Sequence, residues 1–128
     1  MAYGNNPFEV RASSALGTTG EGLDFDNPLA PGIRLTLKCT AVSGTSPTLD
    51  AKVQVYNSVA GTWNDLPGAT WAQVTGATEK LLTIYPGIAE TANESVSDHL
   101  GRRWRLYYTI GGSSTPTVTF SVEGCYLA

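Results

Sequence analysis

The stretch IRLTLKCTAV, residues 33–42, decides the fold class of this chain. Apolar side chains occupy every second position, and Arg34, Lys38 and threonines lie between them. Because successive side chains of a strand point to opposite faces of a sheet, this pattern predicts a strand with one buried and one solvated face. The same two-residue period recurs at residues 49–56, 103–110 and 117–126. These four stretches indicate an all-β protein.

Weaker strand signals fill the intervals between these stretches. Less regular alternation occurs at residues 8–12, 62–66, 70–75 and 79–85. The dipeptide Pro67-Gly68 predicts a turn between two of them. The total of seven or eight short strands favours a single-domain antiparallel β-sandwich, jelly-roll or Ig-like, over residues 8–128. The polar residues 1–7 are predicted to form an N-terminal arm.

Two segments depart from the alternating pattern. Residues 13–32 combine glycine, proline and acidic side chains and are predicted to form a long loop. Within residues 87–101, apolar side chains recur at every fourth position from Ile88 to Leu100, which predicts a helix of one or two turns inside a second loop. Loops of this length in a compact domain are usually functional or packed against a partner.

Residues 42–49 and 110–118 share one order of features: a strand end, a glycine-rich turn, Pro-Thr and a new strand. Glycine supplies unusual backbone angles, and proline cannot donate to a strand ladder. We therefore expect two hairpins whose turns are neighbours at one end of the sandwich.

Length and charge exclude several classes of protein. With 128 residues, 41% of them apolar, the chain is long enough for one domain with its own core. The formal net charge of −3 disfavours nucleic acid as a partner. No apolar stretch has the length of a membrane span, and residues 1–7 lack the regions of a secretory signal, so we expect no membrane partner and synthesis in the cytoplasm.

Residues that could carry chemistry are few. The single histidine, His99, follows Asp98 directly, and adjacent side chains rarely point together, so the two make a poor catalytic dyad. There is no nucleophile elbow and no phosphate-binding loop in the sequence. We therefore expect no enzyme activity and no cofactor.

Cysteines and clustered carboxylates leave two alternatives open. Cys39 and Cys125 are expected to be reduced, buried thiols, with a disulfide between the two sandwich layers as the alternative, and they cannot form a zinc site. An acidic surface loop is expected at Glu21, Asp24 and Asp26, with a calcium site as the alternative.

The aromatic and basic side chains mark candidate surfaces. Trp104 has the parity of the core, whereas Tyr56 and Tyr107 have the outward parity. Trp63 and Trp71 suit strand packing, a protein interface or a sugar-stacking platform. Outward-facing cations are expected at Arg34, Lys38, Arg102, Arg103 and Arg105. These cations form either a solvated face or a patch complementary to an acidic partner.

The motifs at residues 41–50, 61–69, 103–105 and 110–122 give the chain a family resemblance. It resembles the small virion structural proteins of tailed bacteriophages that decorate or cement the capsid shell. The resemblance implies a β-sandwich that oligomerises, often as a trimer, and clamps neighbouring major capsid protein subunits. It also implies a position on the capsid exterior after assembly in the host cytoplasm, and no catalytic residues.

We expect the intermolecular contacts to come from the arm, from the loop at residues 87–101 and from outward-facing side chains. The candidate interface residues are Tyr3, Asn5, Phe8, Tyr56, Ile88, Arg102, Arg103 and Tyr107. The alternative function is a carbohydrate- or receptor-binding module of a phage tail. Trp63 and Trp71 discriminate between the two: a flat exposed pair predicts sugar stacking, and a buried pair predicts packing.

Overall fold

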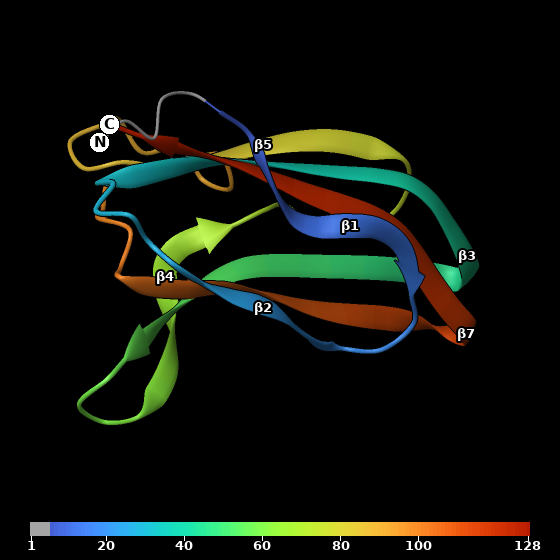
Figure 1. The fold of residues 1–128 in the computed structure, drawn as a ribbon. Coiled ribbons are helices and arrows are strands. Elements are labelled where there is room, and N and C mark those ends of the chain that lie inside the picture. The colour runs from blue at the N-terminus through green and yellow to red at the C-terminus, as the bar shows by residue number, and fades with distance from the viewer. Residues whose placement is uncertain (1–5) are drawn as a thin grey trace.

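The computed structural model describes residues 6–128, which form one mixed sheet of seven strands and contain no helix (Figure 1). The strands are β1 (Phe8–Leu16), β2 (Gly20–Asp26), β3 (Gly32–Asn57), β4 (Thr62–Thr70), β5 (Thr78–Ile84), β6 (Ser95–Val96) and β7 (Arg103–Leu127). Their order is β1-β7-β3-β5-β6, with β2 also on β7 and β4 also on β3. Every strand pair is antiparallel except β5 with β6.

The two long strands β3 and β7 determine the architecture. They pair from Gly32 opposite Leu127 to Val55 opposite Trp104, with register shifts between Cys39 and Ala41 and again within residues 43–48 of β3. Both strands bend where residues 42–49 of β3 face residues 110–118 of β7, and the sheet folds back on itself there into two layers (Figure 1). The β5 layer contains β1, β5, β6 and the adjoining halves of β3 and β7. The β4 layer contains β2, β4 and the other two halves.

The all-β, sandwich-like fold is confirmed, but the prediction of short strands joined by two hairpins is wrong. Residues 42–49 and 110–118 are the facing bends of β3 and β7, and they pair with each other. Both bends lie at one end of the sandwich, as expected (Figure 1). Gly44 has φ +94°, and a Cβ there would lie 2.7 Å from Cα of Pro116, so only glycine fits this crossing.

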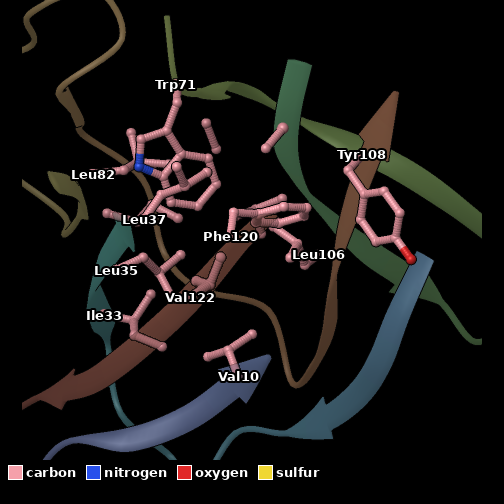
Figure 2. Close-up of a cluster of buried hydrophobic side chains, with 14 of the residues drawn as sticks. Val10, Ile33, Leu35, Leu37, Trp71, Leu82, Leu106, Tyr108, Phe120 and Val122 are labelled. Carbon is pink, nitrogen blue, oxygen red and sulfur yellow. The ribbon is translucent and has the colours of Figure 1, made fainter. Parts of the chain in front are cut away.

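The core lies between the two layers and follows the predicted alternation. In Figure 2, Phe120 lies between Leu37 of the β5 layer and Leu106 of the β4 layer. Trp104 is fully buried, as its parity predicted, and Trp71 is buried with its Nε1 donating to the carbonyl of Lys80 at 3.2 Å. Trp71 therefore belongs to the core, at the crossing from β4 to β5.

The predicted loop at residues 13–32 is mostly strand. Its middle forms β2, where Phe25 stacks on Trp104 with centroids 4.9 Å apart, and this packing outweighs the glycine-rich composition. The predicted helix at residues 87–101 is also wrong. The amides of Thr83 and Tyr85 bond the carbonyls of Glu94 and Val96 at 2.9 and 3.0 Å, so the segment adds the short strand β6 to β5.

Two smaller predictions need correction around Pro67-Gly68. No turn ends the strand there, because β4 continues through a bulge from Asp65, opposite Gln54, to Thr70, opposite Lys52. The predicted strand at residues 70–75 is replaced by a crossing segment with one isolated bridge to β3.

Candidate functional site

The outer face of the β4 layer carries a group of aromatic and cationic side chains. Tyr56 of β3 lies opposite Trp63 of β4, with ring centroids 5.1 Å apart and tilted by 55°. The guanidinium carbon of Arg103 lies 4.6 Å from the Tyr56 ring centre, and that of Arg105 lies 4.2 Å from the Trp63 ring centre. Both arginines come from β7, where alternation puts them on this face. Each aromatic ring therefore already has a cation over it.

A hydrogen-bonded chain fixes Arg105 in this arrangement. Its Nε donates to Oε1 of Gln54 at 2.9 Å, and Nε2 of Gln54 donates to Oδ1 of Asp65 at 3.0 Å. Nζ of Lys52 bonds the other carboxylate oxygen of Asp65 at 2.8 Å. The hydrogen bond from Lys52, and to a smaller extent that from Gln54, lowers the pKa of Asp65. In the same way, the bond from Arg103 Nε, 2.6 Å from Oδ2 of Asp24, lowers the pKa of Asp24.

Asn27 joins two loops at the end of the sandwich where β7 begins. Its Nδ2 donates to the carbonyls of Ala30, Leu100 and Gly101 at 2.7, 3.2 and 3.3 Å, and its Oδ1 accepts from the amide of Ala30 at 2.8 Å. Its own amide bonds the carbonyl of Arg102 at 2.7 Å. The β2–β3 and β6–β7 loops thus form one hydrogen-bonded platform.

Two depressions lie side by side on this platform, and Arg102 borders both. One, of about 290 Å³, is lined by Asp26, Tyr56, Ser58, Arg102 and Arg103. The other, of about 340 Å³, is lined by Asn27, Leu29, Ala30, Pro31, His99, Leu100 and Arg102. We call the two together the end groove. The Arg102 side chain makes no hydrogen bond or ion pair with any residue in the range 6–128.

Two exposed apolar side chains lie on the loops of the same end. Leu29 is 88% exposed on the β2–β3 loop, and Val59 is 97% exposed at the tip of the β3–β4 hairpin. Oδ1 of Asn57 accepts the amides of Val59 and Ala60 at 3.0 and 3.2 Å, which holds the tip in one shape. Figure 1 shows this hairpin projecting from the body of the sandwich at the end where the C-terminus lies.

The structure brings part of the predicted interface together. Tyr56, Arg102 and Arg103 line one depression, as described above. Tyr107 lies farther along the same face, with the ammonium of Lys52 5.4 Å from its ring centre.

The other predicted interface residues lie elsewhere. Phe8 is half-buried and stacks on Tyr126 with centroids 4.9 Å apart, so much of its ring is turned to the protein. Ile88 is half-buried in the β5–β6 connection. Tyr3 and Asn5 lie outside the described residues, as does most of the predicted arm.

Sequence reasoning missed Leu29 and Val59, and it underestimated the role of Trp63. Leu29 could have been suspected, since it is a large apolar residue between two prolines in a segment without alternation. Trp63 is outward-facing and half-buried whereas Trp71 is in the core, so the two tryptophans form no common platform. The proposed sugar-stacking pair is therefore wrong.

The remaining chemical candidates are separate from one another. His99 is exposed at the rim of the end groove. Within residues 6–128 no group of three or more His, Cys, Asp or Glu side chains could hold a metal ion, and Asp24 is ion-paired with Arg103, so the calcium alternative gains no support. Cys39 and Cys125 are both free, which rules out the disulfide alternative, and burial raises the pKa of the Cys39 thiol.

No helix among residues 6–128 could cross a membrane. No known protein-family profile matches the chain, and no curated protein matches its sequence significantly.

Proposed function

We propose that this chain is a non-enzymatic structural protein of a tailed-phage virion that binds the exterior of the capsid shell. The observation that carries the proposal is the platform at one end of the sandwich. There, the end groove and two protruding apolar side chains, Leu29 and Val59, are held by the side chains of Asn27 and Asn57. Binding residues concentrate on loops that a rigid scaffold positions, and a partner would bury the apolar side chains that these loops expose.

The resemblance of the sequence to capsid decoration proteins supplies the partner in this proposal, the major capsid protein. It also supplies the expectation of a homotrimer, which clamps neighbouring capsid subunits. Such binding works by burial of complementary surface around an apolar centre with a polar rim. Sedimentation equilibrium of the purified chain gives the oligomeric state.

A carbohydrate- or receptor-binding module of a phage tail is the second candidate. Tyr56 and Trp63 on the outer face of the β4 layer are the observation in its favour. Sugars stack on free ring faces, however, and Arg103 and Arg105 lie over these two rings. This coverage favours a protein partner for the face.

Co-sedimentation with undecorated shells of the same phage tests the proposal. We expect the wild-type chain to pellet with the shells and the double variant Leu29→Asp/Val59→Asp to stay in the supernatant. Leu81→Asp is the matched control, because Leu81 is 50% exposed on the outer face of the β5 layer, away from the platform. Deletion of residues 1–6 is expected to weaken binding and to leave the far-UV circular dichroism unchanged.

Failure of the wild-type chain to bind shells would overturn the proposal. If glycans quench the tryptophan fluorescence while shells leave the chain in solution, the tail-module alternative replaces it.

A further inference from the structure

We propose that the end groove binds an acidic segment of the partner protein, in which a carboxylate side chain lies close to an aliphatic one. This inference rests on the proposed function in one respect, namely that the partner is a protein. It adds the chemistry of the segment that is recognised and the residues of this chain that recognise it.

The first half of the groove, the depression between Tyr56 and Arg102, contains a cation that is not ion-paired. Arg103 is held by Asp24 through its Nε, and the Arg102 side chain makes no hydrogen bond or ion pair with any residue in the range 6–128. The lining of this half contains two arginines, Arg102 and Arg103, and one carboxylate, Asp26, on a chain whose net charge is −3. A planar guanidinium binds a carboxylate through two parallel hydrogen bonds, so Arg102 fits an aspartate or glutamate side chain.

Ser58 and Tyr56 add hydroxyl groups to the same depression. Neither hydroxyl has a hydrogen bond to another residue of the range 6–128, so both are free to bind a partner's polar groups. Asp26 on the wall would repel a second negative charge. The site therefore suits an isolated carboxylate better than a polyanion, which would need several surplus cations.

The second half of the groove is mainly apolar, although Asn27, His99 and Arg102 also line it. Ala30 and Leu100 are almost fully buried and form its floor, while Leu29 and Pro31 stand at its edge. The backbone of Leu29 has φ +68°, an uncommon value for a residue with a side chain, and Asn27 holds the adjoining loop in place. An aliphatic side chain of the partner would be buried here beside Leu29. Because Arg102 borders both depressions, the carboxylate and the aliphatic side chain must lie near each other on one segment.

Panning of a random twelve-residue peptide library on the immobilised full chain tests this inference. We expect recovered peptides to be enriched in Asp or Glu near Leu, Ile, Val or Met. One recovered peptide, synthesised with a fluorescent label, is then titrated against the variants. Arg102→Ser is expected to weaken its binding at least about tenfold, the loss expected for one charge-assisted pair. Arg34→Ser, an exposed arginine on the outer face of the β5 layer, is the matched control and should leave binding unchanged.

The apolar half has its own variant. Leu29→Asn keeps a residue that tolerates positive φ and removes the aliphatic surface, so it should weaken binding of the same peptide and remove the preference for aliphatic residues on repeated panning. Thermal unfolding of each variant controls for loss of folding.

Recovered peptides without acidic enrichment, or equal losses for Arg102→Ser and Arg34→Ser, would overturn the inference. Displacement of the labelled peptide by oligogalacturonate at concentrations where neutral oligosaccharides have no effect would assign the groove to an acidic sugar and also overturn it. The shell experiment keeps the two proposals apart. If shells bind the Arg102→Ser variant as tightly as wild type, the proposed function is retained and the end groove is not the contact. If the chain binds the peptide but not the shells, the groove inference is retained and the proposed function is overturned.

Discussion

Gln54 shows how one residue organises the outer face of the β4 layer. Among residues 6–128 it is the only buried polar side chain, and its amide is satisfied at both ends, by Arg105 and by Asp65. Buried polar groups of this kind cost free energy unless they are fully bonded. The arrangement therefore holds Arg105 over Trp63 and so keeps the ring covered.

Replacing Asp65 with asparagine should make the stability of the protein less dependent on pH. The bonds from Lys52 and Gln54 lower the pKa of Asp65 in the folded state, so its contribution is present above the unfolded pKa of about 3.9 and is lost as the pH falls through the lower folded value. Because the Asp65 side chain is 54% exposed, we expect its carboxylate to contribute only about 0.5 kcal/mol to the free energy of unfolding.

Urea unfolding at pH 7 and at pH 2 measures this difference. Asp65→Asn should be less stable than wild type at pH 7 and equal to it at pH 2. Asp26→Asn is the control, because the Asp26 carboxylate makes no hydrogen bond or ion pair with another residue of the described part of the chain. A stability difference for Asp65→Asn that persists at pH 2 would contradict the electrostatic explanation.

At the scale of elements, the bends of β3 and β7 are the feature on which the two layers depend. The backbone at Gly44 has φ +94°, and at Gly112 it has φ +120°, with any added Cβ only 2.9 Å from the carbonyl oxygen of Ser46. These bends let two continuous strands contribute to both layers.

Gly44→Ala should therefore destabilise the protein by at least about 2 kcal/mol, through positive φ and through the contact with Pro116. Gly76→Ala is the matched control, since its Cβ would meet nothing within 4 Å and its φ is ordinary. It should change stability by less than about 0.5 kcal/mol. Chemical denaturation of both variants gives the two values, and equal effects would argue against a strained crossing at Gly44.

The strands were predictable where burial alone decides them, and the bends were not. Alternation at residues 33–42 and 103–110 predicts which side chains are buried, because one face of each strand packs on the core. The glycine-rich segments at residues 42–49 and 110–118 satisfy a hairpin and a bend equally well. Only their pairing with each other, across some 70 residues of chain, selects the bend.

In the candidate site, too, the residues on strands were predictable from the sequence and the residues on loops were not. Outward parity identified Tyr56 and Arg103, because strand positions determine the side on which they lie. It could not identify Leu29 or Val59, whose exposure depends on how the β2–β3 loop and the tip of the β3–β4 hairpin fold. The partnership of Arg102 with the Asn27 platform likewise depends on contacts between the β2–β3 and β6–β7 loops.

At the scale of the whole molecule, the shared strands couple the two layers. Neither layer can keep its register if the other loses β3 or β7, because each contains one half of both strands. The protein should therefore unfold in a single cooperative transition, although sandwiches with many separate strands connect their layers mainly through loops.

Alkylation of Cys39 tests whether the two layers unfold together, because Cys39 is buried in the β5 layer and its thiol is free. In a Cys125→Ser variant it is the only thiol, so brief alkylation at each urea concentration reports the opening of that layer alone. Far-UV circular dichroism of the same samples reports both layers. We expect the two curves to share one midpoint. Alkylation of Cys39 well below the midpoint of the circular dichroism curve would show that the β5 layer opens by itself, which the continuous course of β3 and β7 does not allow.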